Sequence, residues 1–190
     1  MSRPDGALLV LGIGNVLLRD EGIGVRVVGE IGRLADRGDV VLPPGTELVD
    51  GGTRGLALLP AVADARAVLV VDAARLGREP GSVTVVRGDA QRAPPDGAPA
   101  PPPGGVAHLL GVAHAAGALP DAVSLVGIEP GEIAVGLDLT DALEAAVPAA
   151  VTAALGEMHR LDATTRPHGL GPGRAGPHST PTHETAQVTA

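Results

Sequence analysis

Short apolar runs alternate along this chain with segments of helical periodicity, and this alternation limits the folds that the sequence can adopt. Apolar runs that can be buried on both faces are typical of strands in a parallel sheet, and the segments between them supply the covering helices. Strands are predicted at residues 7–13, 46–50, 67–72, 82–87 and 122–128. Helices are predicted at residues 22–34, 54–64, 105–117 and 139–158, with Thr140 as a cap for the last of them. The sequence therefore predicts an α/β fold of three layers, in which helices flank both faces of a mostly parallel, twisted sheet.

Two segments fall outside this alternation. Residues 89–104 are too rich in proline for a helix or a central strand, so they are predicted to form an extended connection. Residues 160–190 contain Gly, Pro, Thr and His without apolar periodicity, which favours a disordered tail. We therefore expect one domain over residues 1–159, followed by a tail over residues 160–190.

Composition excludes several classes of function. The formal charge of −8 argues against a nucleic-acid partner, which needs clustered positive side chains. The absence of cysteine excludes disulfides, thiolate metal sites and cysteine nucleophiles, so any metal must bind oxygen and nitrogen ligands. The apolar run at the start of the sequence is too short for a signal peptide or a membrane span. A cytoplasmic protein without membrane contact is expected.

The first predicted strand ends in a turn with two glycines, Gly12 and Gly14. A dinucleotide-binding fold would place a third glycine three residues after the second and an acid about 20 residues further on. Leu17 occupies the position of that glycine, and the next strand ends later than expected, at Asp50. Dinucleotide binding is therefore kept only as an alternative.

Acidic residues follow three of the predicted strands: Asp20 and Glu21, Asp50, and Asp72. Because ligands bind at the carboxyl ends of parallel strands, these carboxylates are expected to converge at one edge of the sheet. Simpler structural roles remain open. Asp20 and Glu21 would also suit the start of a helix, and Asp50 would suit an Asx-turn in which Thr53 caps the next helix. Asp72 follows a strongly apolar strand, where an unpaired carboxylate is unfavourable.

Several motifs in this order resemble the hydrogenase maturation endopeptidases: GIGNVLLRDEGIG, ELVDGGTRGLALLP, LVVDAAR, GALPDAVSLVGIEP and a terminal amphipathic helix. The resemblance covers about residues 7–158. It implies an α/β protein that acts on the large-subunit precursor of a nickel-iron hydrogenase. Proteases of this family remove a short C-terminal extension after nickel insertion, which lets the subunit close around its metal centre.

The resemblance also implies roles for individual residues. Glu21 and Asp72 match two of the family's metal-contacting positions, and Asp50 lies in the family's aspartate-glycine-glycine turn. Asp50 is expected to orient the peptide or to assist proton transfer, and Gly51, Gly52 and Thr53 are expected to contact the substrate. The implied metal is nickel delivered by the substrate, for which zinc or cadmium could substitute.

The family's third metal-contacting residue, a histidine, has no clear counterpart here. In an alignment without gaps its position falls on Pro102, which cannot bind a metal. His108 lies where the family usually has an aspartate, and only a shifted alignment makes it the ligand. A lone histidine in such a helix is more often a surface or hydrogen-bonded residue. His108 is therefore kept as a candidate ligand beside Glu21 and Asp72.

Two mechanisms fit these residues. In one, the carboxylates recognise nickel that the substrate's cysteines already hold, and binding positions the peptide bond that is cut. In the other, a metal held by Glu21 and Asp72 polarises a carbonyl or activates water. A non-catalytic relative that binds a nickel-bearing precursor is the alternative from a different class, because Pro102 replaces the histidine.

Overall fold

The computed structural model describes residues 6–88 and 105–166 of the chain. The strands in these ranges are β1 Leu8–Ile13, β2 Thr46–Gly52, β3 Ala67–Ala73, β4 Val83–Arg87 and β5 Ala122–Ile128. The α-helices are α1 Ile23–Asp36, α2 Leu59–Asp64, α3 Val106–Ala115 and α4 Asp141–Thr165, and two short 3₁₀-helices are η1 Arg19–Gly22 and η2 Gly55–Leu58. Each predicted strand is confirmed. The predicted extended connection at 89–104 lies outside the described residues.

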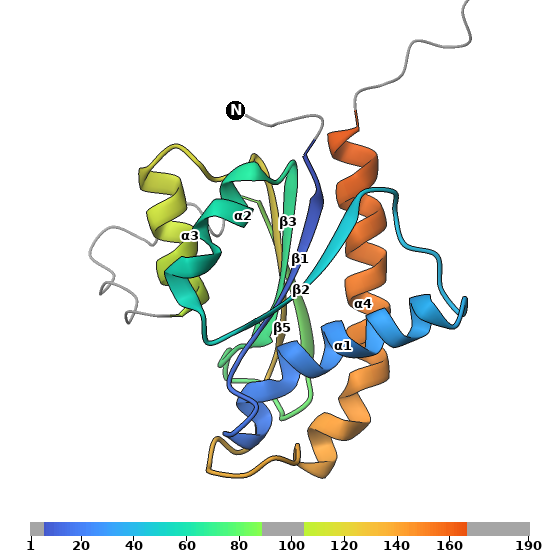
Figure 1. Cartoon of the computed structure of the whole chain (residues 1–190). Coiled ribbons are helices and arrows are strands. Elements are labelled where there is room, and N and C mark those ends of the chain that lie inside the picture. Colours follow the sequence, from blue (N-terminus) through green and yellow to red (C-terminus); the bar gives the residue numbers. More distant parts are fainter. Residues whose placement is uncertain (1–5, 89–104, 167–190) are drawn as a thin grey trace, which may run out of the picture.

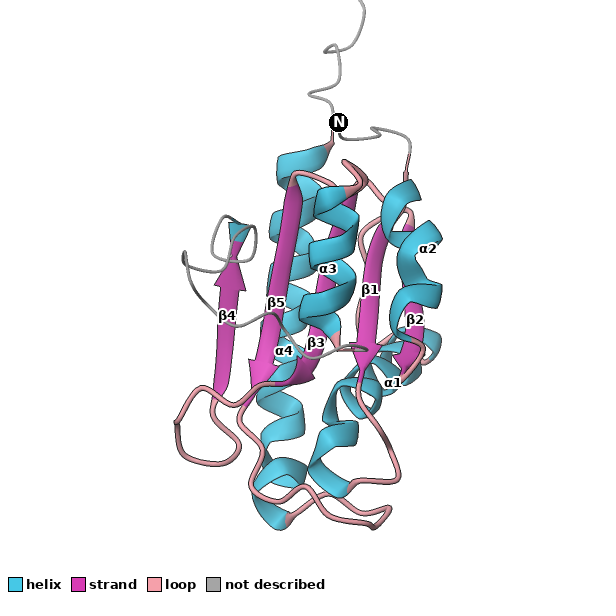
Figure 2. Cartoon of the chain, turned by 90° about the vertical axis from the view of Figure 1, so that its left-hand side faces the viewer, coloured by secondary structure: helices cyan, strands magenta, loops and turns pink. Residues whose placement is uncertain are grey.

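The strands form one sheet in the order β2-β1-β3-β5-β4. Strands β1, β2, β3 and β5 are parallel, and β4 pairs with β5 in the antiparallel direction. Figure 2 shows the parallel strands ending on the same side of the molecule, with long loops beyond them. We call this side the carboxyl edge of the sheet and the opposite side the amino edge.

Two apolar cores cover the two faces of the sheet. Leu8 and Val10 of β1 point into a core made with α1 and α4, whereas Leu9 and Leu11 point into a core made with α2 and α3. Because side chains alternate along a strand, a continuous apolar run fills both cores at once. Figure 1 shows the two helix pairs on opposite sides of the sheet. The predicted three-layer α/β fold is confirmed.

Helix α4 continues to Thr165, whereas the sequence pattern predicts its end at residue 158. Leu161 extends the buried stripe beyond Met158, and both side chains are fully buried. Residues 160–165 are therefore helical, although they belong to the predicted disordered tail. The rest of that tail, residues 167–190, lies outside the described residues.

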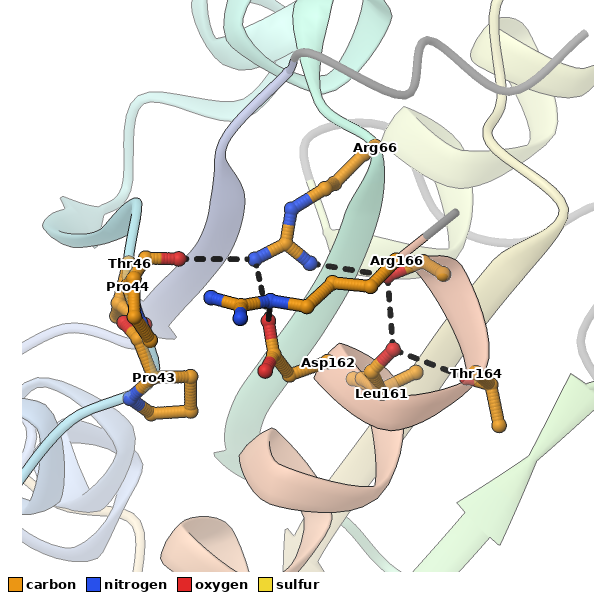
Figure 3. Close-up of polar contacts among 9 residues, drawn as sticks. Pro43, Pro44, Thr46, Arg66, Leu161, Asp162, Thr164 and Arg166 are labelled. Atoms are coloured by element: carbon orange, nitrogen blue, oxygen red, sulfur yellow. Dashed lines mark hydrogen bonds and ion pairs between the residues drawn. The ribbon is translucent and has the colours of Figure 1, made fainter. Parts of the chain in front are cut away.

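A buried arginine explains why the last turn of α4 is held in place (Figure 3). Arg66, directly before β3, is only 4% exposed. It donates hydrogen bonds to Asp162 at 2.8 Å, to Thr165 at 2.9 Å and to the carbonyl oxygen of Pro44 at 3.1 Å. Arg166 donates a further bond to Asp162 at 3.0 Å. These bonds join the end of α4 to two neighbouring segments at the amino edge.

Membrane contact was not expected from the sequence. Within the described residues, no helix combines the length and the apolar character that a membrane span requires.

Candidate active site

Two glycines bring the start of α1 directly against the carboxyl edge. Gly14 has φ of +135°, and a Cβ atom there would lie 1.8 Å from the carbonyl oxygen of Glu21. A Cβ atom on Gly24 would lie 2.2 Å from the carbonyl oxygen of Val71 in β3. No larger residue fits at either position without moving the backbone. The glycines therefore allow η1, which carries Glu21, to lie beside the ends of β1 and β3.

Glu21 and Asp72 are brought together at this edge. Burial raises the pKa of Asp72 to about 7, and the negative charge of Glu21 adds to this rise, while a hydrogen bond from the Ala73 N–H opposes it. The Oε2 atom of Glu21 is buried and has no hydrogen-bond partner among the residues that the structure describes. Two neighbouring, half-buried carboxylates favour binding of a proton or a cation.

Asp20, next to Glu21, has a different environment and a structural role. Its fully buried carboxylate accepts hydrogen bonds from the N–H groups of Gly131, Glu132 and Thr140 and from the Thr140 hydroxyl, at 2.8–3.0 Å. Burial opposes ionisation, but these bonds outweigh it and hold the pKa of Asp20 below its ordinary value. Asp20 thus joins η1 to the connection between β5 and α4.

The helix-capping alternatives are not observed. Helix α1 has Gly22 at its N-cap position, with no side-chain cap, so neither Asp20 nor Glu21 caps it. Thr140 is the N-cap residue of α4, as predicted, but its hydroxyl donates to Asp20 instead of capping the helix. The first turn after β2 also has no side-chain cap, and therefore Thr53 does not cap η2.

Asp50 lies at the same edge but on the other face of the sheet. Gly12 of β1 pairs with both Asp50 of β2 and Val71 of β3, so Asp50 shares the face of Val71, which belongs to the core under α1 and α4. Asp72, the next residue along β3, points to the opposite face. Because β1 separates the two strands, the Cα atoms are roughly 10 Å apart. The structure brings Glu21 and Asp72 together and leaves the exposed Asp50 apart.

The turn after Asp50 is open to solvent on one side. Thr53 is exposed, Gly52 is half-buried, and Gly51 is packed beneath the side chain of Ile13. The Arg54 side chain donates a hydrogen bond to the backbone carbonyl of Asp50, which closes the turn. The exposed part of this turn is compatible with substrate contact, which stays a prediction.

His108 lies in the first turn of α3 and is half-buried. Among the described residues, no group of three or more His, Cys, Asp or Glu side chains is placed to hold a metal ion. His108 is therefore not grouped with Glu21 and Asp72. Pro102, the position of the family's histidine, lies outside the described ranges.

A groove of about 670 Å³ lies between α1 and α4. Val16, Gly22, Val25, Leu137 and Val147 are among the residues that line it. Gly22, which lines the groove, directly follows Glu21 in the sequence, but neither Glu21 nor Asp72 lines the groove.

The role of the segment between β5 and α4 was not predicted from the sequence. Arg19 adopts φ of +50°, and its backbone N–H donates to the carbonyl oxygen of Gly136 at 3.0 Å. Its guanidinium lies 3.2 Å from the Glu132 carboxylate. The sequence feature that could have indicated this role is the composition of residues 129–138, which contain aliphatic side chains but fit neither a strand nor a helix.

A family model described as hydrogenase maturation protease matches residues 25–157. The chain belongs to this family. The Escherichia coli hydrogenase 2 maturation protease is 32% identical over 152 residues, which cover 80% of this chain and 90% of that protein. Two relatives named hydrogenase expression/formation protein HupD match over shorter segments. The Rhodobacter capsulatus protein is 49% identical over 43% of this chain, and the Bradyrhizobium diazoefficiens protein is 43% identical over 46% of it. These segments span less than half of each HupD protein, 37% and 43%.

Solved structures of maturation peptidases have the same fold. The Escherichia coli hydrogenase maturating endopeptidase HybD superposes with a TM-score of 0.70 at 31% identity, covering 81% of this chain and 93% of HybD. A hydrogenase 2 maturation peptidase from a Thaumarchaeota archaeon gives 0.60 at 28% identity, covering 80% and 98%. The family assignment replaces the dinucleotide-binding alternative. The matched family segment begins after Glu21, so the assignment of Glu21 rests on its motif and its position beside Asp72.

Proposed function

We propose that this maturation protease removes the C-terminal extension from the large-subunit precursor of a nickel-iron hydrogenase after nickel insertion. The observation that carries the proposal is the Glu21–Asp72 pair, in which one buried oxygen has no partner and the pKa of Asp72 is raised to about 7. Such a pair favours a positive charge from outside the chain. Nickel carried by the substrate supplies that charge and acts as the recognition element.

The ligand set suits a transient contact better than a permanent metal site. Glu21 and Asp72 supply two carboxylates, whereas permanent catalytic sites usually have three protein ligands. A metal already held by the substrate's own cysteines needs only additional contacts from the enzyme. Carboxylates also bind zinc and cadmium, so either ion is expected to substitute for nickel.

Recognition of nickel positions the peptide bond that is cut. Fixing a substrate beside its reacting groups lowers the barrier to reaction even when each contact is weak. The Cα atoms of Asp50 and Asp72 are roughly 10 Å apart. At that distance Asp50 is assigned to orienting the peptide, with Gly51, Gly52 and Thr53, or to assisting proton transfer. In the second account, Glu21 and Asp72 would themselves hold a metal ion, which would supply Lewis-acid chemistry at the carbonyl.

A non-catalytic relative remains the second candidate, because Pro102 occupies the family's histidine position. Such a protein would bind a nickel-bearing precursor in the cytoplasm without cutting it. The two functions differ in one measurable result, the loss of mass from the precursor.

The test mixes the purified full-length protein with nickel-loaded and nickel-free precursor and follows processing by mass spectrometry. Wild-type protein should cut only the nickel-loaded form. Glu21→Gln and Asp72→Asn should each reduce the rate at least 100-fold while the protein stays folded, because each removes a charge without making a cavity. Equal cutting of both precursor forms would exclude nickel recognition, and binding without mass loss would favour the non-catalytic relative.

The third contact is tested separately by calorimetric titration with Ni²⁺ or Cd²⁺. His108→Ala should weaken binding only modestly, because His108 is not grouped with the carboxylate pair. Pro102→His should strengthen binding by restoring the family's ligand. Complete loss of binding in His108→Ala, without a gain in Pro102→His, would show that the shifted alignment is right.

A further inference from the structure

The exposed aliphatic side chains of this protein are concentrated at the carboxyl edge. Eight large apolar side chains are exposed in the described residues, and seven of them lie in segments that follow the parallel strands. Only Val41, between α1 and β2, lies elsewhere. Five of the seven come from the two segments after β1 and β5, and we call these five the apolar collar: Val16, Leu17, Ile133, Val135 and Leu137.

The two segments of the apolar collar are joined to each other. Leu18 and Gly136 form an isolated parallel bridge, and the Gly136 N–H donates to the carbonyl oxygen of Leu17 at 3.0 Å. The four hydrogen bonds to the Asp20 carboxylate also join these two segments. In spite of this fixed backbone, Val135 is 90% exposed and Leu137 is 74% exposed. The chain thus holds apolar side chains rigidly in water, which is typical of a binding surface.

We infer that the apolar collar docks an apolar surface of the hydrogenase precursor, so that the enzyme recognises a protein surface and not only the cleaved peptide. This inference rests on the proposed function. Val16 and Leu17 of the collar lie on the segment between β1 and η1, and η1 carries Glu21, so a precursor that reaches Glu21 comes close to this part of the collar. Leu56 and Leu76, in the segments after β2 and β3, extend the exposed apolar surface to other strand ends at this edge. A surface built from four strand ends is broader than one extended peptide and fits a folded partner.

Two other occupants agree less well with the charges and the site. A second copy of the chain on this surface would cover Glu21 and Asp72 and exclude the substrate. An anionic membrane would be repelled by a chain of net charge −8, with Glu132 and Asp138 beside the apolar side chains. The precursor is the occupant that uses the apolar collar and the carboxylate pair together.

The experiment measures binding of full-length protein to nickel-free precursor, which the enzyme should dock but not cut. The double variant Val135→Asp/Leu137→Asp should bind at least 10-fold more weakly than wild type in calorimetry. Val41→Asp is the matched control, because Val41 is 82% exposed outside the carboxyl edge, and its binding should stay within twofold of wild type.

Four results would overturn the inference. Equal binding by wild type and the double variant, or no binding by wild type, would show that the collar does not dock the precursor. A wild-type dimer in sedimentation that the double variant converts to a monomer would assign the collar to self-association. Wild-type binding to phosphatidylserine vesicles, lost in the double variant, would assign it to a membrane. If wild type binds nickel-loaded precursor through the collar but never cuts it, the proposed function fails while the docking surface stands.

Discussion

The two edges of the sheet differ in the number of hydrogen-bond partners that their buried charged atoms have. At the amino edge, the guanidinium of Arg66 has acceptors from Asp162, Thr165 and Pro44. At the carboxyl edge, Glu21 and Asp72 repel each other, and Glu21 Oε2 has no hydrogen-bond partner. A buried charge with a full set of partners holds the fold together, whereas one that lacks them indicates a partner outside the chain.

The same contrast occurs between neighbouring residues at the carboxyl edge. Asp20 and Glu21 are adjacent acids in one 3₁₀-helix, but only Asp20 has a full set of hydrogen-bond donors. Asp20 fixes the backbone, so that Glu21 is held near Asp72 although its Oε2 atom has no hydrogen-bond partner among the described residues. The hydrogen bonds of Asp20 thus hold the backbone that positions Glu21.

The largest expected effect on stability comes from removing the contacts of Arg66 at the amino edge. Truncation after His159 removes Leu161, Asp162 and Thr165, which leaves Arg66 without two of its acceptors and exposes apolar surface. Loss of one partner from a buried ion pair costs about 3–5 kcal/mol, and loss of a buried leucine about 2 kcal/mol. Because the truncated site regains some water, we expect the free energy of unfolding to fall by about 4 kcal/mol in urea denaturation.

The matched control is truncation after Arg166, which keeps the three acceptors of Arg66 among the described residues: Asp162, Thr165 and Pro44. It should change the free energy of unfolding by no more than about 0.5 kcal/mol. Similar stability of the two truncated proteins would show that the end of α4 contributes little, and that the Arg66 contacts do not stabilise the fold.

A smaller effect on the free energy of unfolding is expected when the two neighbouring acids, Asp20 and Glu21, are substituted one at a time. Asp20→Ala leaves three N–H groups and one hydroxyl without their acceptor, so it should lower the free energy of unfolding by about 3 kcal/mol. Glu21→Gln should change it by no more than about 0.5 kcal/mol, because no hydrogen bond to Glu21 Oε2 is lost. Thermal and urea unfolding of the two variants measure this difference. Equal destabilisation would mean that Glu21 is also a structural residue.

The fold was predictable because each strand is a continuous apolar run, and burial on two faces needs little beyond such a run. The end of α4 was not, because the tail-like composition after residue 159 concealed Leu161 and the pairing of Asp162 with Arg66. That ion pair joins residues far apart in the sequence, and no local pattern reports it.

The candidate site was predictable to the level of the sheet edge. Strand ends indicate where Glu21, Asp50 and Asp72 lie, but the face on which each side chain points depends on strand register. Register separates Asp50 from Asp72, and the glycine contacts bring Glu21 close to Asp72. The function of Asp20 depends on donors more than a hundred residues away, which the sequence does not place.

The smallest expected effect has the opposite sign and concerns pH. Asp72 keeps its proton in the native state up to a pKa of about 7, whereas in the unfolded chain it loses that proton near its ordinary value of 3.8. Between these values the native state binds more protons, so the free energy of unfolding contributed by Asp72 falls as pH rises. One pKa unit corresponds to about 1.4 kcal/mol, and partial solvation reduces the effect, so Asp72→Asn should stabilise the metal-free protein by about 2 kcal/mol at pH 8. Near pH 4 and below, the variant and wild type should be about equally stable, because both side chains are then neutral in the native state.

Urea denaturation of both proteins at several pH values measures the difference. Parallel curves over the whole range would show that Asp72 is not a strained carboxylate, and the contrast between the two edges would then rest on Glu21 alone.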